Sequence, residues 1–107
     1  MWRWLALSLL VSGCVRGPSS PELVEAKAMV ARGALLLDVR TPEEFAAGHL
    51  DGAVNVPVQV LSTFEVPSDR EIVVYCRSGR RSANAKAMLE GRGVKRVVDI
   101  GGMSNWK

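Results

Sequence analysis

The chain alternates between short apolar runs and segments whose apolar residues recur at helical spacing. Continuous apolar runs are typical of strands buried on both faces of a parallel sheet, whereas recurrence at three and four residues predicts helices. The predicted strands are 34–39, 52–57, 70–76 and 94–100, and the predicted helices are 20–33, 41–48 and 82–90, with a helical turn at 58–64 and a terminal turn after residue 100. Strands that alternate with helices predict a small α/β domain with a parallel sheet and helices on both faces.

Capping residues mark the ends of the first two predicted helices. Ser20 is expected to cap the first helix, and Gly33 to end it. Thr41 is expected to cap the second helix in a capping box with Glu44, and Gly48 to end it. These signals place helix boundaries independently of the apolar pattern.

The first residues differ in kind from the rest of the chain. A single positive charge, an apolar run and a stretch of small residues predict a signal peptide over 1–13. Val11-Ser12-Gly13-Cys14 resembles a bacterial lipobox, which implies lipidation of Cys14, a tether over 14–20 and a domain over 21–107. An ordinary signal peptide and a buried N-terminal helix are the alternatives.

The resemblance to a lipobox also implies a location. A lipidated protein of this kind is exported and anchored to the membrane, because several acyl chains together anchor stably. Val15 stands where an aspartate would favour retention at the inner membrane, so we expect the periplasmic face of the outer membrane. Lipidation of Cys14 would leave Cys76 without an internal disulfide partner.

Composition narrows the possible partners. The chain has 107 residues and a formal charge of +3, which suits one small domain, and we expect a monomer. Its arginines cluster at Arg77, Arg80 and Arg81, without a long basic run, which favours a small anion over nucleic acid. One histidine and one available cysteine predict no metal site, and nothing in the sequence calls for a cofactor.

Cys76 stands between the strongest predicted strand and the strongest predicted helix. Backbone N–H groups of a tight loop and of a helix N-terminus can form an anion cradle there. Nearby arginines add full positive charge, and both effects favour the reactive thiolate over the thiol. Gly79 permits a sharp turn, Ser78 and Ser82 can donate hydrogen bonds, and Ser82 can also cap the helix that follows. The alternative is that Cys76 is a small buried hydrophobe.

Three segments together resemble the rhodanese-type sulfurtransferases. The loop CRSGRRS (76–82) resembles the family's active-site loop, DVRTPEEFAAGHLDGAVNVP (38–57) its N-terminal signature, and VVDIGGMSNW (97–106) its closing strand, double glycine and tryptophan. The motifs stand in the family's order and cover nearly the whole predicted domain. The resemblance implies a single-domain rhodanese-like fold whose loop cysteine takes up sulfur as a persulfide.

The resemblance also implies a reaction. Cys76 would take sulfane sulfur from thiosulfate and pass it to cyanide or a thiol, in a two-step covalent scheme. The expected substrate-binding residues are those of the loop: Arg77, Ser78, Gly79, Arg80, Arg81 and Ser82. A membrane-tethered binding or sensing module without turnover is the alternative. Phosphatases that share the fold have five residues between cysteine and arginine, whereas Cys76 and Arg81 have four, so we expect no phosphatase activity.

Other residues at the same sheet edge have structural interpretations. Asp38 and Arg40 can form a wall of the pocket, although holding two loops together is the favoured role. Gly101 and Gly102 can form another part of the wall by letting the backbone approach the loop. His49 is expected to satisfy backbone groups, and Trp106 to cover the core.

Overall fold

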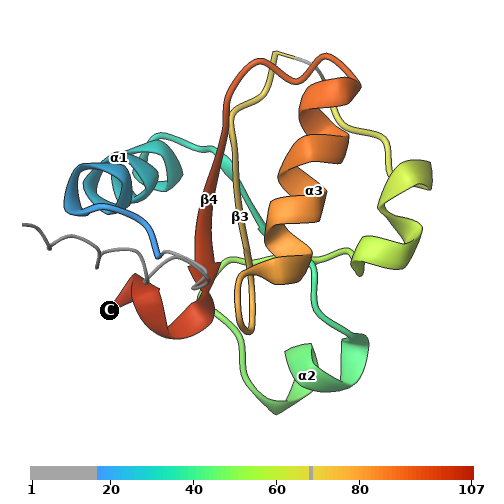
Figure 1. Cartoon of the computed structure of the whole chain (residues 1–107), viewed down its shortest axis with the longest axis horizontal. Helices are drawn as coiled ribbons and strands as arrows, with labels where there is room; N and C mark the ends of the chain where they lie inside the picture. The colour runs from blue at the N-terminus through green and yellow to red at the C-terminus, as the bar shows by residue number, and fades with distance from the viewer. Residues whose placement is uncertain (1–16, 68) are drawn as a thin grey trace, which may run out of the picture.

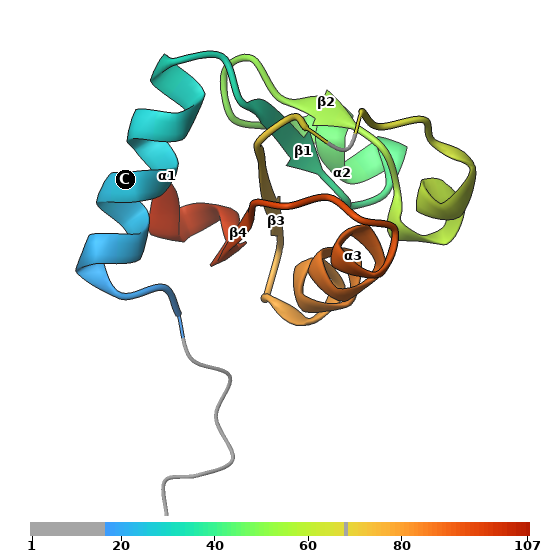
Figure 2. The ribbon, with the colours of Figure 1, turned by 90° about the horizontal axis from the view of Figure 1, so that it is seen from above.

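A computed structural model describes residues 17–67 and 69–107. The predicted signal peptide (1–13), Cys14 and Val15 lie outside the described residues. Strands β1 (Leu35–Asp38), β2 (Val54–Asn55), β3 (Ile72–Cys76) and β4 (Val97–Gly102) form one parallel sheet in the order β2-β1-β3-β4 (Figures 1 and 2). The predicted parallel sheet is confirmed, but β4 begins later than predicted and continues through both glycines.

Helices cover both faces of the sheet, as predicted. Helix α1 (Ser20–Ala31) and the 3-10 helix η3 (Met103–Trp106) pack on one face, while α3 (Arg80–Gly91) and the 3-10 helix η2 (Val58–Thr63) pack on the other (Figure 2). Helix α2 (Pro42–Ala47) lies beyond the carboxyl end of β1 (Figure 1). No helix in the described part of the chain is both long enough and apolar enough to cross a membrane.

The sheet divides the core into two layers. Along β3, Val74 and Cys76 join the cluster beneath α3, whereas Val73 and Tyr75 join the cluster beneath α1. This alternation follows from the two-residue repeat of a strand. All five residues of β3 are buried, which agrees with the continuous apolar run in its sequence.

The observed helix ends correct two predictions. Helix α1 is capped by Ser19, not Ser20, because Glu22 stands three residues after Ser19 and completes the capping box with it. Helix α3 begins at Arg80, two residues before the predicted start at Ser82. Gly79 precedes α3 in the left-handed region with φ of 103°, so this helix begins without a side-chain cap.

The prediction for α2 is confirmed. Thr41 Oγ1 accepts a hydrogen bond from the Glu44 N–H at 3.1 Å, and Glu44 Oε1 accepts one from the Thr41 N–H at 3.0 Å. Gly48 ends the helix. This box fixes Glu44 at the edge of the sheet where the β1 and β3 loops meet.

Candidate active site

The carboxyl ends of three strands meet at one edge of the sheet. Asp38 ends β1 and pairs in register with Tyr75, and Cys76 ends β3 opposite Gly102 of β4. Arg40 follows β1 by two residues. In open α/β sheets ligands bind beyond the carboxyl ends of strands, so this edge is the candidate site.

The loop between β3 and α3 encloses the sulfur of Cys76. The Gly79 N–H donates to Sγ at 2.9 Å and the Ser82 N–H at 3.3 Å. The thiol in turn donates to the Ser82 hydroxyl oxygen at 3.3 Å, and that hydroxyl donates to the Gly79 carbonyl at 3.2 Å. When the sulfur carries negative charge, the Ser82 hydroxyl can rotate and donate to it as well. The loop is therefore built as an anion cradle around one atom.

Close backbone packing holds this loop in place. A side-chain carbon added at Gly102 would lie 2.6 Å from the Arg77 carbonyl oxygen, closer than van der Waals contact permits. The predicted close approach of the double glycine to the loop is thus present in the structure, at Gly102. Any side chain there has to displace the loop or β4.

Cys76 is fully buried, in contrast to the tip of its own loop. Arg77, Ser78 and Arg80 are exposed, whereas Gly79 and Ser82 are buried. In this structure Sγ is therefore not exposed to solvent, and the exposed part of the loop is its tip. Burial of this kind agrees with the hydrophobe interpretation, but the N–H groups directed at Sγ are a feature that a purely apolar cysteine does not need.

Arg81 turns towards α2. Its guanidinium donates to both carboxylate oxygens of Glu44, at 2.8 and 3.1 Å. These hydrogen bonds, followed by that from the Thr41 N–H, lower the pKa of Glu44 to about 2. Glu44 correspondingly raises the pKa of Arg81. Within residues 17–67 and 69–107, Arg77 and Arg80 form no ion pair.

A buried polar network lies beside the loop. Arg40 Nε and Nη2 donate to the Asp38 carboxylate at 2.7 to 3.1 Å, and Nη2 also donates to the Gly48 carbonyl at 2.7 Å. The Tyr75 hydroxyl donates to Asp38 at 2.7 Å and accepts from the Leu50 N–H at 3.1 Å. Burial, with a further contribution from Asp38, raises the pKa of Tyr75 to about 12, so the hydroxyl remains a donor. The network holds the end of α2 and the following turn to β1 and β3.

A cleft of about 400 Å³ opens next to the loop. Its lining residues are Arg40, Glu44, Ala47, Arg77, Met103 and Ser104. Arg40 and Arg77 were expected at the site from the sequence, but the other four were not. Glu44 carried only a capping signal in the sequence, and Met103 and Ser104 carried no chemical signal.

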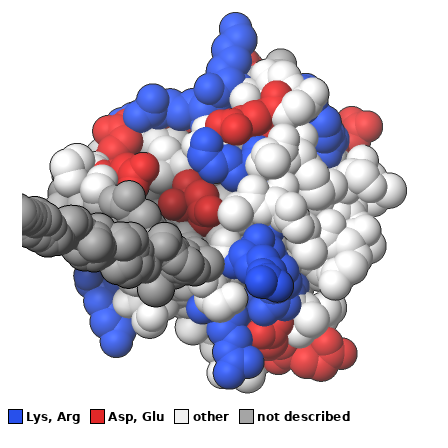
Figure 3. All heavy atoms as spheres, viewed as in Figure 1, with Lys and Arg blue, Asp and Glu red and all other residues white. Residues whose placement is uncertain are grey.

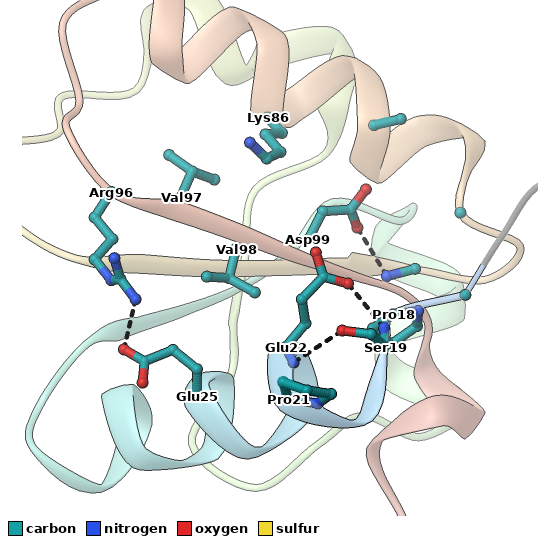
Figure 4. Close-up of a pocket in the computed structure, with 14 residues that line it drawn as sticks. Pro18, Ser19, Pro21, Glu22, Glu25, Lys86, Arg96, Val97, Val98 and Asp99 are labelled. Atoms are coloured by element: carbon teal, nitrogen blue, oxygen red, sulfur yellow. Dashed lines mark hydrogen bonds and ion pairs between the residues drawn. The ribbon is translucent and has the colours of Figure 1, made fainter.

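A larger hollow of about 960 Å³ lies on the other side of the loop, between the start of α1, α3 and the outer edge of β4 (Figure 4). Its walls mix charges: Arg96 reaches from the start of β4 to Glu25 of α1, and Lys86 faces the hollow from α3. Basic and acidic side chains are also interspersed on the face drawn in Figure 3. Cys76 lines neither hollow: the larger one reaches the loop at Gly79, and the smaller cleft reaches it at Arg77, where Arg40 also lines the wall.

His49 and Trp106 both pack against neighbouring parts of the fold. His49 Nδ1 lies 2.8 Å from the Phe45 carbonyl oxygen, and its ring stacks on Phe45 with centroids 3.6 Å apart. Trp106 packs against the cluster that contains Tyr75. Among the described residues, no three His, Cys, Asp or Glu side chains are placed to share a metal ion.

Comparisons with known proteins agree with this geometry. The family model of the rhodanese-like domain matches residues 22–107. A sulfurtransferase of Allochromatium vinosum is 43% identical over 75 residues, covering 67% of this chain and 70% of the relative. Thiosulfate sulfurtransferase GlpE of Pseudomonas entomophila is 36% identical over 91 residues, covering 82% of each. The solved structure of the human single-domain sulfurtransferase TSTD1 superposes with a TM-score of 0.71 at 28% identity, covering 86% of this chain and 95% of that one.

Proposed function

The chain belongs to the rhodanese-like family of sulfurtransferases, and we propose that it moves sulfane sulfur from thiosulfate to a thiol or cyanide through a persulfide on Cys76. The Pseudomonas relative is named a thiosulfate sulfurtransferase. The cradle around Cys76 suits the anionic states of such a cycle.

The proposed cycle has two displacement steps. The Cys76 thiolate attacks the outer sulfur of thiosulfate, a bond forms between the two sulfur atoms, and sulfite leaves with the electron pair of the broken bond. Cyanide then attacks the outer sulfur of the persulfide and leaves as thiocyanate, or a thiolate attacks it and becomes a persulfide. Either route returns the Cys76 thiolate, so the cycle needs no external oxidant or reductant.

The observation that carries the proposal is the pair of N–H groups directed at Sγ. The Gly79 and Ser82 amides donate to this atom at 2.9 and 3.3 Å. Charge-assisted hydrogen bonds from preorganised amides stabilise an anion without reorganisation during the reaction. The same donors serve the thiolate before the first step and the sulfur that leaves in the second.

The cleft provides the approach for the donor. Thiosulfate is a small dianion, and Arg77 brings an exposed cation to the cleft that Arg40 also lines. Arg80, Ser78 and the remaining loop residues stay predicted contacts of the substrate. Because Cys76 is fully buried, we propose that the exposed loop tip shifts when the anion binds.

A turnover assay on the full-length chain tests the proposal. Purified protein is mixed with thiosulfate and cyanide, and thiocyanate and sulfite are both measured. We expect both products from the wild type and neither from Cys76→Ser, with both proteins giving the same circular dichroism spectrum. Folded wild-type protein that makes no more of either product than Cys76→Ser would refute turnover.

A binding or sensing module without turnover is the second candidate, and the full burial of Cys76 favours it. In that case thiosulfate would bind in the cleft without sulfite release. Calorimetric titration with thiosulfate distinguishes the two: saturable binding with no sulfite in solution supports the module, and sulfite stoichiometric with protein supports transfer.

We also propose that the chain is exported and anchored through a lipid on Cys14. The support is the Val11-Ser12-Gly13-Cys14 motif after an apolar run. Metabolic labelling with a radioactive fatty acid in a bacterial host should label the wild type and not Cys14→Ser, which should also leave the membrane fraction. Equal labelling and equal fractionation of the two proteins would contradict the anchor.

A further inference from the structure

Glu44 occupies a position that its capping role alone does not explain. It lines the cleft beside Arg77, yet its carboxylate is turned to Arg81 through two hydrogen bonds. Both partners are about a quarter exposed, with side-chain exposures of 25% for Glu44 and 29% for Arg81. An acidic residue in a site expected to bind an anion requires a reason of its own.

The charges around the cleft cancel in pairs. The Asp38 carboxylate compensates Arg40 at 2.7 Å, and the Glu44 carboxylate compensates Arg81 at 2.8 Å. Within residues 17–67 and 69–107, Arg77 is the cleft-lining cation that has no carboxylate partner. The cleft is lined by Arg40 and Arg77, and Arg81 pairs with its Glu44, so with both carboxylates counted the cleft presents about one net positive charge.

We propose that Glu44 limits the affinity of the cleft for oxyanions, and keeps it low by neutralising Arg81. Sulfate and phosphate resemble thiosulfate in charge and size but carry no sulfane sulfur. A strongly cationic cleft would hold these inert anions, and would also hold the product sulfite. With Glu44 in place, thiosulfate is selected by its reaction with Cys76 rather than by the strength of ion binding. This inference rests on the proposed function.

The isosteric change Glu44→Gln isolates the charge. Glutamine keeps the oxygen that accepts from Arg81 and can take part in the capping box with Thr41. We expect the KM for thiosulfate and the inhibition constants of sulfate and phosphate each to fall about threefold to tenfold, because an uncompensated cation is left near the anion. The effect should shrink as ionic strength rises. The maximal rate should not increase, since sulfite leaves a more cationic cleft more slowly.

Matched variants control the experiment. Glu43→Gln makes the same change of net charge at an exposed neighbour outside the cleft, and we expect it to keep the wild-type constants. Arg81→Gln leaves Glu44 uncompensated and should raise the KM. The double variant Glu44→Gln/Arg81→Gln restores the balance and should recover most of the affinity lost in Arg81→Gln. The recovery also tests the inference if Glu44→Gln alone folds poorly.

Protection of Cys76 provides a readout that does not depend on turnover. Inorganic phosphate is titrated against alkylation of Cys76 by iodoacetamide in the full chain, and the concentration for half protection is expected to fall in Glu44→Gln. Equal protection and equal KM in Glu44→Gln and Glu43→Gln would overturn the inference, as would a raised KM that the double variant fails to recover. A wild type that makes no thiocyanate refutes the proposed function instead, and the phosphate titration then decides the role of Glu44 separately.

Discussion

Two regions at the same edge of the sheet use arginine in opposite ways. In the network of Asp38, Arg40 and Tyr75, the charges are buried and each carboxylate oxygen has donors. In the loop from Cys76 to Ser82, Arg77 and Arg80 are exposed and the backbone N–H groups converge on a sulfur atom. The first region is complete without a ligand, whereas the second is arranged for an anion that it does not itself contain.

This difference shows how neighbouring charges divide between structure and chemistry. Removing one partner from a buried ion pair leaves an uncompensated charge, so substitutions in the network should lower the free energy of unfolding. The exposed charges of the loop contribute little to stability, so substitutions there should change the activity and leave the free energy of unfolding nearly unchanged. Four changes of decreasing effect test whether the two regions separate in this way.

Asp38→Asn should have the largest effect. It leaves the buried Arg40 guanidinium without a negative partner and replaces one of the two oxygens that accept from Arg40 and Tyr75 by an amide nitrogen, which is itself a donor. We expect the free energy of unfolding to fall by about 3–5 kcal/mol. Urea unfolding followed by circular dichroism measures it, with exposed Asp51→Asn as the control. If Asp38→Asn lowers the free energy of unfolding no more than Asp51→Asn does, the network does not stabilise the fold.

Gly102→Ala should affect the loop more than the fold. The added carbon would meet the Arg77 carbonyl oxygen at 2.6 Å and displace the cradle from Sγ. Misplacement by about an ångström can cost about 100-fold in rate, and we expect a loss of that order in thiocyanate formation. Gly91→Ala is the matched control, because nothing lies within 4 Å of a side-chain carbon there. Wild-type activity in Gly102→Ala would show that the close approach has no bearing on the site.

Tyr75→Phe should produce a smaller loss, in stability. It keeps the packing of the ring but leaves the Leu50 N–H without its acceptor and removes one of the donors to the Asp38 carboxylate, which Arg40 still satisfies. The cost of such an unsatisfied group is about 1–3 kcal/mol. Thermal and urea unfolding should detect this decrease, with transfer activity close to wild type. A loss of activity without a loss of stability would place Tyr75 in the chemistry instead.

The smallest effect should be the loss of stability in acid that the Glu44–Arg81 pair causes. The Arg81 hydrogen bonds lower the pKa of Glu44 from 4.5 to about 2 in the folded chain. A group with a lowered folded pKa stabilises the fold above its unfolded pKa and loses that contribution as pH falls through the folded value. Between pH 4.5 and 2, wild-type stability should therefore fall more steeply than that of Glu44→Gln. Equal slopes in the two proteins would mean that the pair adds no stability.

Local patterns were sufficient to predict the layers of the fold. The apolar run of β3 and the capping box at Thr41 depend on residues that are close in sequence, and both are found in the structure. The start of α3 was misplaced because Ser82 resembles a cap, whereas Gly79 takes the left-handed conformation and Ser82 turns to the sulfur. Side-chain identity alone does not reveal which backbone angle a loop adopts.

The candidate site was predicted in part. The position of Cys76 at a strand end follows from the sequence, and so does the close approach of Gly102. The pairing of Glu44 with Arg81 does not, because 37 residues separate them and the capping box already accounted for the carboxylate. The burial of Cys76 was only the alternative interpretation of the sequence, since it depends on how tightly the loop packs against β4.

Detection of the persulfide on Cys76 is the most direct test of the proposed sulfur transfer. Full-length protein is treated with thiosulfate, without an acceptor, and its intact mass and Cys76-containing peptide are measured. We expect the protein to gain the mass of one sulfur atom on Cys76, to release one equivalent of sulfite and to lose the added mass on treatment with cyanide. Unchanged mass in folded protein, or added sulfur on another residue while Cys76 stays a thiol, would contradict it.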